Sequence, residues 1–202
     1  MPAQSHLELL EIAKEAAAAG SNALEKHWGK LEQVRCKGRP GDLVTEADLA
    51  AEAAVLAVLH QRCPRIGVLA EEAGLQGPLG ELQWCVDPLD GTTNYAHGFP
   101  LFACSVGLLK NGKPILGAIE APALQQSYWG GHGLGAYCNG ELLQVSGCND
   151  LSESLLVTGF AYDRFEVQNN NYTNFVIFPT AAMGLGAVEP PPLIWHLWQQ
   201  GG

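Results

Sequence analysis

The sequence predicts an α+β fold in which two helices are followed by a meander of antiparallel strands. Apolar residues recur at helical spacing in two N-terminal segments, whereas two Asn-Gly pairs further along each lie between short apolar runs. Asn-Gly between apolar runs indicates a tight hairpin, because both turn residues need a positive φ angle. Helices first and strands afterwards are typical of a layered α+β domain.

Two helices are expected before the strands. The first covers about Leu7–His27, where leucine and alanine recur three or four positions apart, and Gly20 is a point at which it could break. The second starts near Thr45, which stands three residues before Asp48 in a weak form of the capping box, and it ends before Pro64.

Short apolar runs predict the strands that follow. Residues 66–69 and 84–86 are the first candidates, and each run precedes an acidic cluster. Two hairpins are expected around Asn111 and Asn139, each of which is followed by glycine. The run that starts at Leu155 adds a further strand.

The composition excludes several functional classes. Hydrophobic residues make up 47% of the 202 residues and charged ones 16%, against roughly 25% charged in an ordinary domain. The net charge of −10 argues against nucleic acid or an anionic membrane as a partner, since both are held mainly by Lys and Arg. No apolar run approaches a membrane span, so we expect a cytoplasmic protein. The six cysteines form no CxxC pair and are interpreted as free thiols.

Three acidic clusters follow one another along these elements. Asp42 and Asp48 stand near the start of the second helix. Glu71 and Glu72 follow one predicted strand, and Asp87 and Asp90 follow the next. Side chains at the C-terminal ends of neighbouring strands converge on one crevice, where like charges repel unless a cation joins them. An all-oxygen site suits Mg²⁺, a hard cation that keeps water molecules and accepts a substrate phosphate.

The turn after the second of these strands predicts a phosphate site. Proline and glycine tighten it, so Asp87 and Asp90 can face one point with the Leu89 carbonyl between them. A helix that starts at Gly91 and Thr92 would turn its free N–H groups toward the same point and hold an anion. Carboxylates, metal ions and a helix N-terminus together predict hydrolysis of a phosphate ester, in which two metal ions activate a water molecule.

These residues carry a resemblance to a known family. Residues 69–72, Leu-Ala-Glu-Glu, and residues 84–95, Trp-Cys-Val-Asp-Pro-Leu-Asp-Gly-Thr-Thr-Asn-Tyr, resemble the first signature of the inositol monophosphatase family. Similarity extends from Lys37 through residues 137–146 to about Phe175. The resemblance implies a layered αβαβα sugar-phosphatase fold, of which this chain would hold the N-terminal half. It also implies Mg²⁺-dependent hydrolysis of a small phosphate monoester, inhibited by lithium in many members, and allows a homodimer.

The resemblance also assigns metal ligands. Glu71, Asp87 and the Leu89 carbonyl would hold the first metal ion, and Asp87 with Asp90 would reach the second.

Further roles concern water and phosphate. Glu71 and Thr92 would orient the attacking water, with Asp48 supporting the Thr92 hydroxyl. Asp90, Gly91 and Thr92 would receive the substrate phosphate.

The C-terminal part departs from the family. Members carry a G-V-R-R segment and later a W-D-x-A-A-G signature, whose Asp completes the second metal site, and neither pattern is found here. Glu189 is the only charged residue from Gln168 onward, and no periodicity predicts an element after about Phe175. We therefore divide the chain into 1–175, the N-terminal part of an inositol monophosphatase-like domain, and 176–202, an aberrant tail.

We interpret this tail as a frame-shifted reading of the family's sequence. With suitable synonymous codons for residues 182–201, reading from the third base of the first codon gives Asn-Gly-Val-Arg-Arg and the rest of the absent segment. Coding DNA without that segment in a shifted frame would contradict this interpretation. Because the segment would supply core elements and a carboxylate, we expect this chain to fold poorly or to have little activity.

Two alternative functions stay open. The same chemistry could act on fructose bisphosphate, histidinol phosphate or a nucleotide 3′-phosphate, since relatives share the metal motifs. The chain could also be an inactive fragment that binds metal or phosphate.

Overall fold

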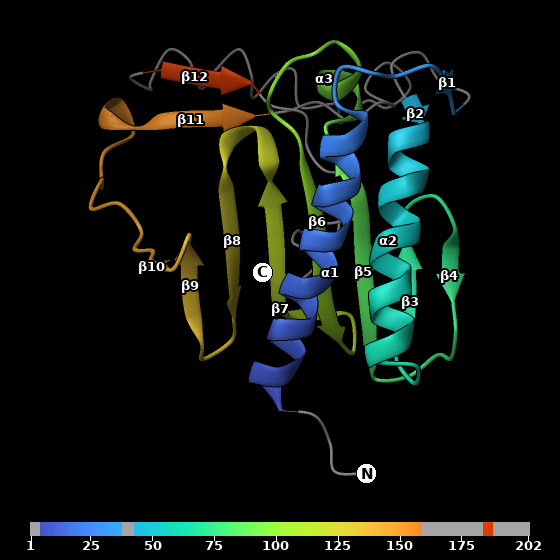
Figure 1. The fold of residues 1–202 in the computed structure, drawn as a ribbon. Helices are drawn as coiled ribbons and strands as arrows, with labels where there is room; N and C mark the ends of the chain where they lie inside the picture. Colours follow the sequence, from blue (N-terminus) through green and yellow to red (C-terminus); the bar gives the residue numbers. More distant parts are fainter. Residues whose placement is uncertain (1–4, 38–42, 159–183, 188–202) are drawn as a thin grey trace, which may run out of the picture.

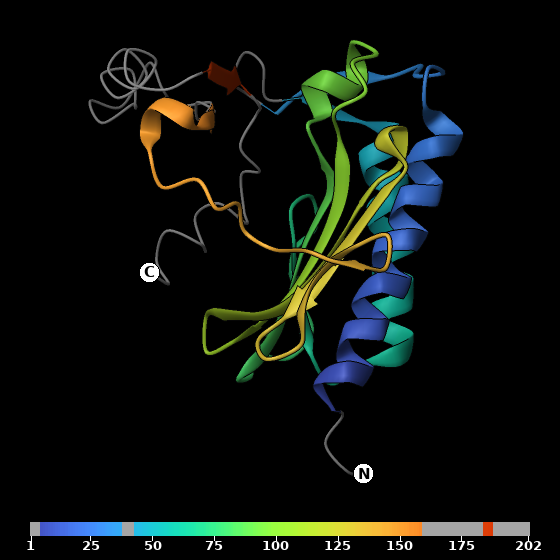
Figure 2. The ribbon, with the colours of Figure 1, turned by 90° about the vertical axis from the view of Figure 1, so that its left-hand side faces the viewer.

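Two long helices pack side by side on one face of a large mixed sheet (Figure 1, Figure 2). The computed structural model describes residues 5–37, 43–158 and 184–187. The sheet has eight strands in the order β10-β9-β8-β7-β6-β5-β3-β4. Helices followed by a largely antiparallel sheet confirm the predicted α+β class.

Helix α1, His6–His27, is continuous through Gly20, so the possible break at this glycine is not observed. The helix begins where the Ser5 side chain accepts the N–H of Glu8. A Cβ atom at Gly20 would lie 2.5 Å from Cys104 Sγ and 2.8 Å from a Val55 methyl carbon. Glycine therefore serves close packing of α1 against its neighbours rather than a change of chain direction.

This close packing gives a testable stability effect. We expect Gly20→Ala to lower the free energy of unfolding by about 1 to 2 kcal/mol, because overpacking outweighs the better helix propensity of alanine. Ala18→Gly, at a partly exposed position of the same helix, is the control and should cost about 1 kcal/mol through propensity alone. Urea unfolding followed by circular dichroism measures both, and a more stable Gly20→Ala protein would contradict the packing argument.

Helix α2, Glu46–Arg62, begins with the capping box that the sequence predicts. The Thr45 hydroxyl accepts the N–H of Ala47 at 3.1 Å, and the Asp48 carboxylate accepts the N–H of Thr45 at 2.8 Å. The helix ends before Pro64, as expected. Asp48 is completely buried, so this cap lies inside the protein rather than on its surface.

Strands β3 and β5 are parallel neighbours, and every other adjacent pair in the large sheet is antiparallel. Both Asn-Gly hairpins are confirmed, with positive φ angles at Asn111 and Asn139 and at the glycines that follow. The bounds of the strands are β3 Gly67–Ala70, β4 Gly74–Gln76, β5 Leu82–Asp90, β6 Ala103–Lys110, β7 Lys113–Ala121, β8 Gln126–Gly131, β9 Gly135–Cys138 and β10 Glu141–Leu142.

Strand β5 extends further than the sequence indicates. Asp87 and Asp90 were expected after the strand, whereas the structure includes both in it, with an irregular register against β6 between them. Pro88 lies in this irregular stretch and has no N–H to donate to the neighbouring strand. The interruption therefore falls between the two acidic residues.

Shorter elements surround the sheet. A strand at Leu155 is confirmed, but the strand β12 after residue 175 was not expected. Its Gly-Leu-Gly-Ala sequence is too short and too glycine-rich to show an alternating pattern, and it forms through parallel pairing with β11. The rest of the predicted tail lies outside the described residues. The bounds are β1 Val34–Cys36, β2 Leu43–Thr45, α3 Thr92–Ala96, β11 Leu155–Thr158 and β12 Gly184–Ala187, with single 3₁₀ turns at Pro122–Leu124 and Leu151–Glu153.

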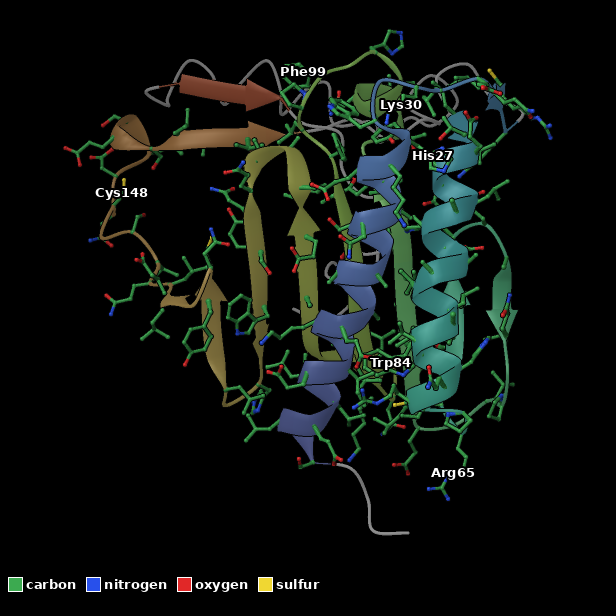
Figure 3. The ribbon with its side chains drawn as sticks, viewed as in Figure 1. His27, Lys30, Arg65, Trp84, Phe99 and Cys148 are labelled. Atoms are coloured by element: carbon green, nitrogen blue, oxygen red, sulfur yellow. The ribbon has the colours of Figure 1, made fainter. Side chains whose placement is uncertain are left out.

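The core lies between the two long helices and the sheet. Trp84 of β5 is its largest side chain and sits between α1 and α2, toward the end of the sheet opposite α3 (Figure 3). None of the described helices is both long and apolar enough to cross a membrane. All six cysteines are free thiols.

An aromatic cluster fixes α3 to the C-terminal end of α1. The rings of Trp28, Tyr95 and Phe102 lie with their centroids 4.5 to 4.9 Å apart. The Tyr95 hydroxyl also donates a 2.6 Å hydrogen bond to the Leu24 carbonyl. These contacts hold the segment that follows β5 at one end of the sheet.

Candidate active site

The parallel strands β3 and β5 bring the acidic residues together at their C-terminal ends. The Ala70–Val86 register continues one residue further, because the Glu71 N–H donates to the Val86 carbonyl at 3.1 Å. Glu71 is thereby placed beside Asp87 in the neighbouring strand. The convergence follows from strand direction, as the sequence argument requires. Asp42 lies outside the described residues.

Asp87 is a buried carboxylate that lacks compensation. It is completely buried, and neither of its carboxylate oxygens has a hydrogen-bond partner in the described part of the chain. Burial, together with the negative charges of Glu71 and Asp90, raises its pKa well above the ordinary range for Asp. An uncompensated carboxylate here is costly unless a proton or a cation joins it.

Lys37 brings a basic group to this cluster. Its Nζ atom lies 2.8 Å from Glu71 Oε1 and also contacts the carboxylate of Glu72. Burial opposes the charge of Lys37, but hydrogen bonds and the negative charges of the two glutamates outweigh it and raise the pKa of the ammonium group. The ammonium group therefore neutralises Glu71, whereas Asp87 keeps both oxygens unpartnered among the described residues.

Thr92, the first residue of α3, and Asp48 of α2 form a buried pair. The Thr92 hydroxyl lies 3.2 Å from Asp48 Oδ1 and 3.0 Å from the Leu89 carbonyl. Asp48 Oδ2 accepts the N–H and the hydroxyl of Thr45, so its other oxygen faces Thr92. Burial raises the pKa of Asp48 even though these donors favour its charged form. The contact that the family resemblance implies between these two residues is present.

Helix α3 begins where the sequence predicts. Gly91 is its N-cap, with a φ angle of 84°, and the Tyr95 N–H donates to the Gly91 carbonyl at 2.9 Å. The Asn94 side-chain amide donates to the Leu101 carbonyl at 2.8 Å and so links α3 to the chain that follows it. The first N–H groups of α3 therefore lie at the same end of β5 as Asp90.

The donor set fits a hard cation better than a transition metal. No three His, Cys, Asp or Glu side chains within the described ranges gather closely enough to ligate one ion together. Mg²⁺ does not need such a group, because it binds through one or two carboxylates, water molecules and substrate phosphate. The unpartnered Asp87 carboxylate, with Glu71 beside it and the Leu89 carbonyl two residues further along β5, offers oxygen ligands of this kind.

The comparisons decide the family. The sequence model of the inositol monophosphatase family matches residues 6–184. The chain belongs to the inositol monophosphatase family. The match continues past Phe175, and the frame-shifted origin of the tail stays a prediction that the coding DNA tests.

Relatives cover most of this member of the inositol monophosphatase family. Inositol-1-monophosphatase of Synechocystis sp. is 45% identical over 177 residues, which are 87% of this chain and 62% of the relative. Fructose-1,6-bisphosphatase/inositol-1-monophosphatase of Aquifex aeolicus is 42% identical over 153 residues, which are 75% and 58% of the two chains. The chain thus spans about three fifths of the length of these relatives.

A solved structure of the inositol monophosphatase family superposes well on this chain. The inositol monophosphatase from Anabaena (Nostoc) sp. matches with a TM-score of 0.79 at 40% identity, covering 91% of this chain and 68% of that one. The helix pair and the large sheet of the present structure accordingly belong to the layered αβαβα fold of the family.

Sequence reasoning missed Glu52, and it missed the contact between Lys37 and Glu72, although both of these residues lie in segments that it singled out. Lys37 and Glu72 meet only because the chain segments before β2 and after β3 come together, and no local pattern predicts that contact. Glu52 had a usable signal, since it follows Asp48 by four positions and therefore lies on the same face of α2.

Proposed function

We propose that the chain carries the metal and phosphate site of a Mg²⁺-dependent phosphatase for a small phosphate monoester such as inositol monophosphate. The observation that carries this proposal is the buried, unpartnered carboxylate of Asp87 beside Glu71. Glu71, Asp87 and the Leu89 carbonyl would hold a first ion, and Asp87 with Asp90 a second. Mg²⁺ would supply Lewis-acid chemistry, drawing charge from the phosphate oxygens and activating water for attack.

The residues of the chain would orient the reacting groups. Asp48 is the acceptor that remains for the Thr92 hydroxyl when the Leu89 carbonyl serves as a ligand. A hydroxyl has one proton and two lone pairs, so Thr92 can donate to Asp48 and still accept a hydrogen bond from water. Glu71 would accept from the same water and direct it toward the phosphorus atom.

Phosphate would be received at the start of α3. The N–H groups of Gly91 and Thr92 lie at the N-terminus of this helix, where backbone dipoles favour an anion, and Asp90 precedes them. Backbone donors suit a protein with a net charge of −10, because they attract phosphate without basic side chains.

The name of one relative favours a second substrate. The Aquifex aeolicus relative is a fructose-1,6-bisphosphatase as well as an inositol-1-monophosphatase, so fructose bisphosphate is the strongest alternative. A chain that binds metal and phosphate without turnover is the non-catalytic alternative. A homodimer and a cytoplasmic location stay predictions, which light scattering and cell fractionation would check.

The test is an assay of the purified full chain with and without Mg²⁺. Inositol monophosphate, fructose bisphosphate, histidinol phosphate and a nucleotide 3′-phosphate would be compared by phosphate release, and Mn²⁺ binding would be followed by electron paramagnetic resonance. Because the chain lacks the segment that would complete the second metal site, we expect turnover well below that of a full-length relative, and this turnover should require Mg²⁺ and fall with added lithium. Mn²⁺ binding without turnover would favour the non-catalytic alternative, and the absence of both would contradict the proposed site.

A further inference from the structure

Helix α2 carries a second buried carboxylate one turn after Asp48. Glu52 is only 5% exposed, and its Oε2 atom accepts the N–H of Glu72 at 2.9 Å and the N–H of Ala73 at 3.3 Å. A carboxylate is expensive to bury unless hydrogen bonds compensate it. Here the compensating donors belong to the two residues directly after Glu71.

Glu71 is consequently held from two sides. On its N-terminal side, its own N–H continues the pairing of β3 with β5 by donating to the Val86 carbonyl. On its C-terminal side, the chain turns away from β3 toward β4, and the Glu52 carboxylate binds the N–H groups of this turn. The Glu52 carboxylate thus accepts hydrogen bonds from backbone N–H groups that lie beyond the end of β3.

The orientation of Glu71 depends on this turn. Its carboxylate and that of Glu72 both contact the Lys37 ammonium group, although successive residues of an extended strand would point to opposite faces. The turn that Glu52 stabilises is therefore what allows the two carboxylates to converge. A looser turn would let Glu71 follow Lys37 away from Asp87.

We propose that Glu52 is a positioning residue that fixes the backbone after Glu71 and thereby sets the affinity of the site for a divalent cation. The identity of the cation site rests on the proposed function, whereas the backbone contact does not. The oxygen acceptor of Glu52 carries this role, and its negative charge is not required.

Three substitutions separate the acceptor from the charge. Glu52→Gln keeps an oxygen acceptor at the same reach, Glu52→Asp keeps the charge but withdraws the acceptor by one methylene group, and Glu52→Ala removes both. Glu46→Ala is the matched control, because the Glu46 carboxylate also accepts two backbone N–H groups, those of Glu32 and Gln33, but in a loop outside the site.

The readout is Mn²⁺ affinity measured by electron paramagnetic resonance on the full chain, together with hydrogen exchange of the Glu72 and Ala73 amides. We expect Glu52→Ala and Glu52→Asp to weaken Mn²⁺ binding by about 10- to 100-fold and to speed exchange of both amides. The Mn²⁺ affinity of Glu52→Gln should stay within about threefold of the wild-type value, and that of Glu46→Ala within about twofold. Both changes are smaller than the loss of affinity expected when a residue that supports a metal ligand is removed.

The possible failures are distinguishable. A wild-type chain without Mn²⁺ affinity overturns the proposed function and this inference with it. If Glu52→Asp binds Mn²⁺ as tightly as the wild type does, the inference alone is overturned. The same holds if Glu52→Gln binds Mn²⁺ as weakly as Glu52→Asp does. Because Glu52→Asp is a small change, the test holds even where Glu52→Ala does not fold.

Discussion

Asp87→Asn is expected to abolish Mg²⁺ binding and to make the metal-free protein more stable. The wild-type carboxylate is fully buried without hydrogen-bond partners in the described residues, and Glu71 and Asp90 add negative charge beside it. Removing the charge while keeping the shape should raise the free energy of unfolding by about 1 to 3 kcal/mol without metal. A variant that is more stable but no longer binds Mg²⁺ would show that Asp87 serves metal binding rather than stability.

Unfolding in urea with EDTA and with Mg²⁺ tests this pair of effects. Wild-type protein should gain about 2.7 kcal/mol when Mg²⁺ is present at 100 times its dissociation constant, and Asp87→Asn should gain nothing. Asp150→Asn is the control, because the Asp150 carboxylate is exposed and, among the described residues, its hydrogen bonds are to nearby Ser152 alone. Equal Mg²⁺ stabilisation of wild type and Asp87→Asn would show that Asp87 is not a ligand.

Gly91→Ala is expected to disable the site through the backbone. Gly91 has a φ angle of 84°, and an added Cβ would lie 2.9 Å from the Leu101 carbonyl oxygen. The left-handed conformation costs an alanine about 1 to 2 kcal/mol, and the contact with Leu101 forces the turn to move. A displacement of the reacting groups by ~1 Å can cost about 100-fold in rate, so we expect a loss of that size in turnover and a matching loss of Mn²⁺ affinity.

Gly112→Ala separates the two causes. Gly112 has a φ angle of 76°, almost the same as that of Gly91, but apart from its two chain neighbours no described residue comes within 4 Å of the position of its added Cβ. This variant should lose about 1 kcal/mol of stability and keep its Mn²⁺ affinity. If both variants lost stability alike and both still bound Mn²⁺, the close approach of Leu101 to Gly91 would have no functional meaning.

The parts of the fold that the sequence predicts are those that depend on near neighbours. The Thr45–Asp48 capping box and the two Asn-Gly hairpins involve contacts within a few residues, so their patterns are complete in the sequence. The convergence of Glu71 and Asp87 was predictable for another reason, since parallel strands bring their ends to one edge.

Features that depend on contacts between distant segments escaped prediction. Gly20 indicates a helix break by composition, and only the 2.5 Å approach to Cys104 Sγ shows that it serves packing. The pairing of Lys37 with Glu71 and Glu72 likewise joins residues more than thirty positions apart. Neither contact leaves a periodic signal, because the first depends on where α1 and β6 come to lie in space and the second on where the chain after β1 meets the chain after β3.

Asp48 also restricts how this region of the gene can change. As the third residue of a capping box, position 48 would accept Glu or Gln with little harm to the helix. The same side chain, however, uses one oxygen to begin α2 and the other to hold Thr92. A longer residue could keep the cap and still lose the hydrogen bond with the Thr92 hydroxyl. Substitutions at position 48 that would leave α2 intact are therefore excluded by the contact with Thr92.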